Sequence, residues 1–171
     1  MEKENFYECY PCWMVAISNL LSIAVYAIGA FLMYQFGLAC FIAYLMYVMW
    51  LELRLLGGHC INCFYYGKTC AFGKGKLSAI LFKRGDSKKF SQMQITWKDI
   101  APDFLISIIP MAAGVILLIR DFNWLVLALI ILIALFGFVG SGLVRSLLAC
   151  KYCKQRELGC PAEQLFNKTK K

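Results

Sequence analysis

Four long runs of uncharged, mostly apolar residues dominate the chain. They are Cys12 to Tyr34, Phe36 to Leu51, Phe104 to Ile119 and Trp124 to Val144. A helix that spans a bilayer needs roughly 17 to 25 mainly apolar residues. The pattern therefore predicts four transmembrane helices, with the shorter second and third runs extended by flanking residues such as Glu52 to Leu56 and Asp103.

The segments between these runs alternate between very short and long. Gln35 to Gly37 and Arg120 to Asn123 are tight connections without net charge, whereas long polar segments follow the second and fourth runs. The alternation predicts an all-α integral membrane protein built from two tandem helical hairpins. The composition agrees, because 61% hydrophobic and 16% charged residues exclude an ordinary soluble domain.

Basic residues concentrate in the two long polar segments. From Arg54 to Pro102, nine Lys or Arg stand against two Asp, and from Arg145 onward seven stand against two Glu. Because Lys and Arg near span ends tend to stay in the cytoplasm, we expect a multi-pass protein of the cytoplasmic (inner or plasma) membrane with both termini inside. The formal net charge of +8 then reflects topology and contact with anionic lipid, and no nucleic acid partner is expected.

Two cysteine motifs with the same spacing follow the predicted hairpins. Residues 60–70 read CINCFYYGKTC and residues 150–160 read CKYCKQRELGC, and both have the spacing Cys-x2-Cys-x6-Cys. The recurrence indicates an internal repeat, with a first repeat over residues 1–70, a basic loop over 71–102 and a second repeat over 103–171. Parallel repeats are related by an axis along the membrane normal, so we expect the two motifs to meet on the cytoplasmic face.

Eight of the nine cysteines fall on this expected cytoplasmic side. Structural disulfides are rare there, and clustered thiols bind metal or carry out redox chemistry. Two cysteines three positions apart can direct both sulfurs to one metal. The candidate metal ligands are Cys9, Cys12, Cys60, Cys63, Cys70, Cys150, Cys153 and Cys160. The ninth cysteine, Cys40, lies within a span and is interpreted as a small buried apolar residue.

The spacing does not decide how the eight thiols are divided between metal sites. In one arrangement the first site contains Cys60, Cys63, Cys150 and Cys153, and the second contains Cys9, Cys12, Cys70 and Cys160. In another, a trio of cysteines takes an outside thiol or His59 as its fourth ligand. His59 is a candidate ligand, a candidate hydrogen-bond donor to a ligand, or an exposed or capping residue beside Gly57 and Gly58. Nearby cations would offset the negative charge of the thiolates, and these are Lys68, Lys151, Lys154 and Arg156.

The sequence leaves two kinds of metal centre open. Pro161 follows Cys160 as a proline follows the last cysteine of bacterial cluster motifs, which favours iron-sulfur. The six-residue gap is not a ferredoxin spacing, and paired knuckles in short loops favour zinc. Haem held by two histidines is excluded, because His59 is the only histidine. The leading hypothesis is one or two iron-sulfur clusters of the 4Fe-4S type that transfer electrons, and the alternative is a zinc-stapled membrane scaffold or assembly protein.

A third hypothesis concerns Cys9 and Cys12, which form a Cys-x2-Cys pair at the start of the first span. A thiol near a helix N-terminus has a lowered pKa and suits thiol-disulfide exchange. The sequence does not decide whether the protein is an enzyme, since it contains no nucleotide-binding loop and no Ser/His/Asp set.

Partners beyond the lipid bilayer follow from the electron-transfer hypothesis. They would be a soluble redox donor or a larger membrane complex, and a lipophilic electron carrier near Tyr26, Tyr44, Tyr47 and Trp50.

Within the basic loop, the apolar residues from Leu77 to Phe82 lie between cations on both sides. This pattern is typical of a short helix that lies in the headgroup layer.

Overall fold

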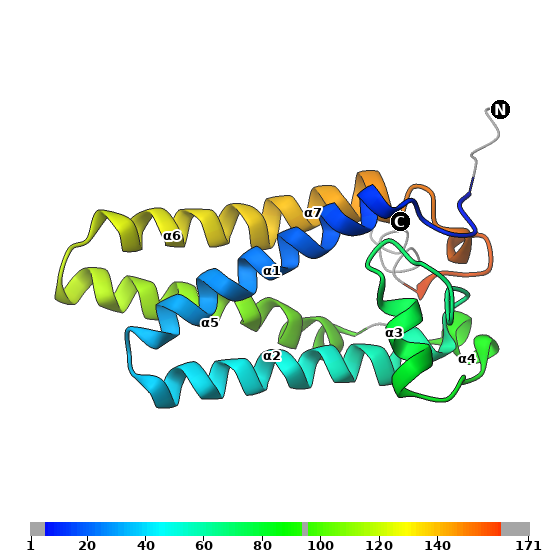
Figure 1. Cartoon of the computed structure of the whole chain (residues 1–171), viewed down its shortest axis with the longest axis horizontal. Helices are drawn as coiled ribbons and strands as arrows, with labels where there is room; N and C mark the ends of the chain where they lie inside the picture. Colours follow the sequence, from blue (N-terminus) through cyan, green and yellow to red (C-terminus); the bar gives the residue numbers. More distant parts are fainter. Residues whose placement is uncertain (1–5, 94–95, 162–171) are drawn as a thin grey trace. The chain divides into compact units, whose positions relative to one another are not determined.

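A computed structural model describes residues 6–93 and 96–161 of the chain. Within these ranges the chain is helical, with one isolated β-bridge between Tyr7 and Cys153 and no strand. The α-helices (Figure 1) are α1 (Cys12–Tyr34), α2 (Leu38–Gly58), α3 (Lys74–Leu81), α4 (Ser87–Gln92), α5 (Trp97–Arg120), α6 (Trp124–Ala134) and α7 (Ser141–Leu143). Short 3-10 turns cover Cys60–Asn62 and Lys154–Arg156, and π-helical stretches cover Leu135–Gly140 and Val144–Ala149.

Four stretches are long and apolar enough to cross a membrane, as predicted. They are Cys12–Tyr34, Leu38–Asn62, Lys98–Arg120 and Trp124–Ala149. Only 11% to 28% of each most apolar window is buried inside the protein, so most of the apolar side chains face outward. A helix in water would present polar residues on that face. By length and composition, the chain is therefore a multi-pass membrane protein, and its second and third spans include the flanking residues as expected.

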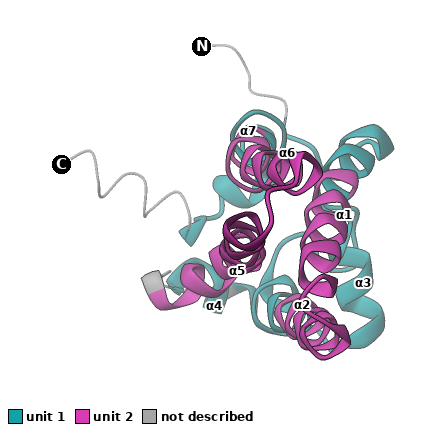
Figure 2. Ribbon diagram, turned by 90° about the vertical axis from the view of Figure 1, so that its left-hand side faces the viewer, with its two compact units in different colours: residues 1–19, 53–97, 144–171 teal, residues 20–52, 98–143 magenta. Residues whose placement is uncertain are grey.

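The chain folds into two compact units, which Figure 2 shows in different colours. The membrane unit comprises residues 20–52 and 98–143, and the cysteine unit falls within residues 1–19, 53–97 and 144–171. All eight candidate ligand cysteines belong to the cysteine unit, whereas Cys40 belongs to the membrane unit. Three segments that are distant in sequence thus bring the N-terminal Cys-x2-Cys pair and both longer motifs into one unit.

In the membrane unit, a tyrosine compensates for a proline in α5. Pro110 lacks the N–H that would bond to the Ile106 carbonyl four residues earlier. The hydroxyl of Tyr44, on α2, donates to that carbonyl oxygen at 2.9 Å. Gly29 on α1 makes room for this side chain, because a Cβ there would overlap the Tyr44 hydroxyl. A backbone carbonyl in an apolar environment is costly without a partner, so this contact lets α5 contain a buried proline.

Other tyrosines join the helices of the membrane unit in the same way. The Tyr47 hydroxyl donates to the Pro102 carbonyl at 2.8 Å, and the Tyr26 hydroxyl donates to the Glu52 carboxylate at 2.6 Å. Trp50 stacks on Tyr47 with ring centroids 6.0 Å apart. The tyrosines that we considered as a lining for a lipophilic carrier therefore use their hydroxyls to connect α1, α2 and α5.

Candidate metal centre

Aromatic residues form the core of the cysteine unit. Its buried members are Tyr10, Met14, Tyr65, Ala71 and Ala149. The ring of Tyr10 lies 5.5 Å from that of Tyr7 and 5.6 Å from that of Tyr65, measured between centroids. Tilted aromatic pairs at this distance contribute about 0.5 to 1.5 kcal/mol beyond their burial. Because the core draws on the N-terminal segment and on both cysteine motifs, it holds the three groups of cysteines together.

Hydrogen bonds from two tyrosines tie these segments to one another. The Tyr65 hydroxyl donates to the Tyr7 carbonyl at 2.6 Å and accepts a bond from the Lys154 N–H at 3.0 Å. The Tyr10 hydroxyl donates to the Ala149 carbonyl. Burial raises the pKa of Tyr65 to about 12 and also raises the pKa of Tyr10. Both hydroxyls therefore keep their protons, and remain donors, at any physiological pH.

The two Cys-x2-Cys turns have the same local hydrogen bond. The N–H of Cys63 bonds to the Cys60 carbonyl at 3.3 Å, and the N–H of Cys153 bonds to the Cys150 carbonyl at 3.4 Å. Both second cysteines have an extended backbone, with φ −78° and ψ 152° at Cys63 and φ −83° and ψ 116° at Cys153. This match in local structure accompanies the match in spacing.

The residues that lead into the two turns differ. The first turn follows the end of α2 at Gly58, whereas the second follows the π-helical stretch Val144–Ala149. There the Cys150 N–H bonds to the Arg145 carbonyl, five residues back, at 2.7 Å. A π-turn contains one residue more than an α-turn and so changes the direction of the side chains that follow. Cys150 is exposed, whereas Cys60 is half-buried.

Thiols from both motifs pack beside the aromatic core. Cys63, Cys70 and Cys153 pack against it. Burial raises the pKa of Cys63 to about 11, and the nearby Cys153, Cys70 and Cys160 raise that pKa further when they ionise. Burial likewise raises the pKa of Cys153 to about 11, with added contributions from Cys160 and Cys150. We call Cys63, Cys70, Cys153 and Cys160 the composite thiol set; it groups the second and third cysteines of both motifs.

Backbone N–H groups partly offset this effect of burial. The backbone of Tyr65 hydrogen bonds to Cys63 and lowers its pKa, and the backbones of Gln155 and Arg156 do the same for Cys153. Such bonds stabilise the charged form of a thiol. They also surround metal-bound thiolates, where they tune the properties of the centre. Cys63 and Cys153 therefore each have backbone hydrogen bonds that would stabilise a thiolate.

The cysteine thiols are not spaced as they would be around a bound metal ion in the described part of the chain. Among the described residues, no group of three or more Cys, His, Asp or Glu side chains is placed to hold a metal ion. None of the nine cysteines, all of which lie in the described ranges, forms a disulfide; Cys9, Cys12 and Cys150 are exposed, and the others are half-buried. Each ligand assignment made from the sequence therefore stays a prediction.

The other predicted site residues belong to the cysteine unit. The Nδ1 atom of His59 is buried and has no hydrogen-bond partner within residues 6–93 and 96–161. The Lys68 ammonium lies 4.4 Å from the centre of the Phe64 ring, and the Lys151 ammonium lies 5.4 Å from that of Tyr152. Through its backbone, Arg156 contacts the Cys153 thiol. Positive charge thus lies close to the rings that pack around the thiols.

Lys154 gives this region a further cation and an ion pair. Its ammonium lies 5.6 Å from the centre of the Phe64 ring and 2.9 Å from the Glu8 carboxylate. The hydrogen bond and charge of Lys154 lower the pKa of Glu8.

Sequence reasoning missed the role of the tyrosines, although each motif carries aromatic residues directly beside its cysteines. That local enrichment is the signal that could have identified the core.

The donor set determines the chemistry that this region can support. Cysteine thiolates are soft ligands, which suit zinc or an iron-sulfur cluster and not magnesium or calcium. Comparisons of the chain with protein-family models, with curated proteins and with solved structures find no match. The functional argument therefore rests on the chemistry of the residues described above.

Proposed function

We propose that the protein is a membrane-bound metalloprotein whose composite thiol set binds an iron-sulfur cluster for electron transfer. One observation carries the proposal: Cys63 and Cys153, which occupy equivalent positions in the two repeats, pack against the same aromatic core. Cys70 packs there too, and Cys160 is close enough to influence both thiols electrostatically. Four cysteine thiolates are the usual ligands of 2Fe-2S and 4Fe-4S clusters.

Metal binding would draw these thiols together and release their protons. With a pKa of about 11, Cys63 and Cys153 are neutral in the metal-free protein at physiological pH. A metal that binds thiolates must displace those protons, so binding and local ordering are coupled. The remaining cysteines of the cysteine unit would supply a second centre, and they are Cys9, Cys12, Cys60 and Cys150.

Two features favour iron-sulfur over zinc. Pro161 follows Cys160, the arrangement found at the end of bacterial cluster motifs. The ammonium groups of Lys68, Lys151 and Lys154 lie on aromatic rings of the cysteine unit, where they would offset the negative charge of a thiolate-bound cluster. The second candidate function is a zinc-stapled scaffold, which is favoured by the matching hydrogen bonds of the two Cys-x2-Cys turns.

The four spans give this centre its cellular setting. The excess of Lys and Arg in the segments that contain the motifs favours a cytoplasmic location for the cysteine unit and for both termini. Each predicted hairpin then enters from the cytoplasm and returns to it. A soluble donor would reduce the centre, and a membrane complex or a lipophilic carrier would accept the electron.

Matched cysteine substitutions test the proposal. Cys63→Ser, Cys153→Ser and the control Cys40→Ser are purified anaerobically in detergent, and iron, zinc, acid-labile sulfide and visible absorbance are measured. We expect both motif variants to lose the centre and Cys40→Ser to keep it, because Cys40 lies in the membrane unit. Unchanged metal content in both Cys63→Ser and Cys153→Ser would overturn the composite thiol set. A colourless protein whose zinc is lost in Cys63→Ser and Cys153→Ser would favour the zinc-stapled scaffold.

A further inference from the structure

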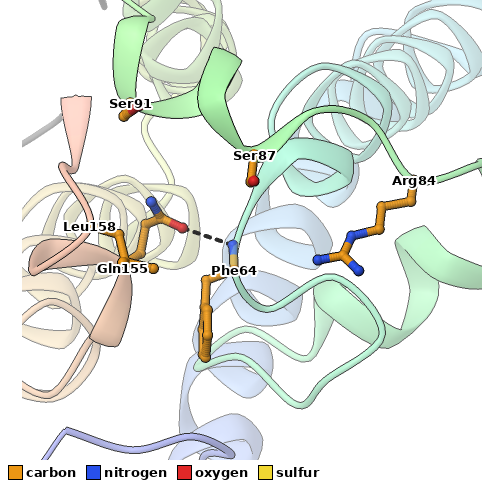
Figure 3. A pocket seen from close by; sticks show the side chains of 6 residues that line it. All are labelled: Phe64, Arg84, Ser87, Ser91, Gln155 and Leu158. Carbon is orange, nitrogen blue, oxygen red and sulfur yellow. Dashed lines mark hydrogen bonds between the residues drawn. The ribbon is translucent and has the colours of Figure 1, made fainter.

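The cysteine unit contains a cavity of about 270 Å³ on its surface. Its lining comes from both cysteine motifs and from the segment around α4, and the residues are Phe64, Arg84, Ser87, Ser91, Gln155 and Leu158 (Figure 3). We propose that this cavity binds the phosphate group of a ligand, either a lipid headgroup or a soluble phosphate ester. The volume is near the lower limit for small-molecule sites, which suits a compact group such as phosphate.

Each polar side chain that lines the cavity can donate a hydrogen bond, and these are Arg84, Ser87, Ser91 and Gln155. Gln155 is 5% exposed, and its side-chain oxygen accepts a bond from the Phe64 N–H at 2.7 Å. In Figure 3 the amide nitrogen of Gln155 points away from Phe64. In Figure 3 the Arg84 guanidinium and the Ser87 hydroxyl are directed toward Phe64 and Gln155. Among the residues that line the cavity there is no carboxylate.

The charge around the cavity favours an anion. Phe64 forms one wall, and its ring has the Lys68 ammonium 4.4 Å away and the Lys154 ammonium 5.6 Å away. Glu8, the acidic partner of Lys154, has a side chain that is 68% exposed. Asp86 is close to Arg84 in sequence but does not line the cavity. Arg84 is the cation in the lining of the cavity, and Lys68 and Lys154 add positive charge near its Phe64 wall, so the local charge favours an anion.

Arg84 is held in a position from which it can meet a phosphate. Its guanidinium carbon lies 6.0 Å from the centre of the Tyr66 ring, and the Tyr66 hydroxyl donates to the Phe82 carbonyl at 2.8 Å. A planar guanidinium presents two parallel N–H groups that match two oxygens of a phosphate. Phe64 and Leu158 add apolar surface beside the donors, which suits a phosphate attached to a carbon chain.

The neighbouring helix α3 indicates a lipid as the nearest source of such a ligand. Leu77, Ile80 and Leu81 are 45%, 79% and 52% exposed, whereas Ser78 is fully buried and donates to the Leu56 carbonyl at 3.3 Å. The helix therefore docks through a small polar residue and presents its apolar residues outward. That arrangement suits a helix at the bilayer surface, and Arg84 follows it by three residues.

Binding of two phosphate probes to the full-length protein in neutral detergent tests the inference. The probes are inorganic phosphate and short-chain phosphatidylglycerol, and binding is measured by titration calorimetry. Arg84→Gln removes the guanidinium, and the control Lys83→Gln removes one positive charge from the adjacent exposed residue, which does not line the cavity. We expect saturable binding that Arg84→Gln weakens about tenfold or more, whereas Lys83→Gln changes it by less than about twofold.

The two probes distinguish the sources of the phosphate. Saturable binding of phosphatidylglycerol without inorganic phosphate identifies a lipid headgroup, and saturable binding of both identifies a general phosphate site. Ser87→Ala, which removes one hydroxyl and no charge, should weaken binding severalfold and covers the case in which Arg84→Gln does not fold. Absence of saturable binding, or equal weakening by Arg84→Gln and Lys83→Gln, would overturn the inference. Phosphate binding is measured without reference to metal content, so this test is independent of the test of the metal centre.

Discussion

The Tyr44 hydroxyl donates a 2.9 Å hydrogen bond to the Ile106 carbonyl, the backbone group that Pro110 leaves without a helical partner. Tyr44 is on α2, whereas Ile106 and Pro110 are on α5. The bond therefore satisfies a carbonyl inside an apolar unit and also fixes one helix against another. Proline is tolerated in membrane helices when a neighbouring group replaces the lost donor.

Tyr44→Phe should lower the free energy of unfolding by about 1 kcal/mol, because the Ile106 carbonyl loses its donor. In a Pro110→Ala background the new N–H at position 110 can bond to the same carbonyl. The cost of Tyr44→Phe should then fall clearly below its value with Pro110 present. Unfolding in mixed micelles measures all four members of this double-mutant cycle. Strictly additive effects would mean that Tyr44 and Pro110 are not coupled through Ile106.

Cys63 and Cys153 should react with alkylating reagents only at high pH in the metal-free protein. Their pKa of about 11 lies about two units above that of an ordinary thiol, so near pH 8 their thiolate fraction is about a hundredfold smaller. Alkylation resolved by mass spectrometry should therefore accelerate at both sites until about pH 11. A plateau near pH 9 at both residues would contradict the effect of burial.

Tyr65→Phe should loosen the contact between the N-terminal segment and the second cysteine motif. The substitution leaves the Tyr7 carbonyl and the Lys154 N–H without the partner that they share, at a cost of about 1 to 3 kcal/mol. Hydrogen exchange at the Lys154 amide should become faster. Tyr66→Phe is the matched control, because the Tyr66 hydroxyl donates to Phe82, a residue of its own segment. Equal exchange rates in the two variants would rule out the bridging role of Tyr65.

Both termini should lie on the cytoplasmic side, since Lys and Arg concentrate in the segments that contain the cysteine motifs. A green fluorescent protein fused to the C-terminus should fluoresce, and alkaline phosphatase fused at the same position should be inactive. A second pair of fusions within the connection from Arg120 to Asn123 should give the reverse pattern. Active phosphatase at the C-terminus would show that the topology is inverted and that the cysteines face an oxidising compartment.

The membrane-spanning helices were predictable because the cost of placing charge in lipid sets their pattern. The first uncharged run, Cys12 to Tyr34, coincides with α1. The second run stops at Leu51, but α2 continues to Gly58. The uncharged run ends where the sequence allows the first charge, whereas the helix ends where its backbone hydrogen bonds stop. Glu52 therefore lies inside α2, where its carboxylate accepts a hydrogen bond from the Tyr26 hydroxyl.

The arrangement of the cysteines was only partly predictable. Spacing predicts that Cys60 and Cys63 share a turn, because that relationship is local. The recurrence of the motif also predicts that Cys63 and Cys153 can share a site. The packing of Cys70 against the same core depends on contacts between distant segments, such as the bond from Tyr10 to Ala149 across 139 positions. The π-helical stretch Val144–Ala149, which sets the direction of Cys150, has no comparable pattern in the sequence.

The central claim is tested most directly by analysis of iron, zinc and acid-labile sulfide in the wild-type protein. The protein is purified anaerobically in detergent, and its visible spectrum is recorded on the same sample. We predict roughly four or eight irons per chain, a matching amount of sulfide and broad visible absorbance. A colourless protein with one or two zinc ions per chain, or with no metal, would contradict the assignment of an electron-transfer centre.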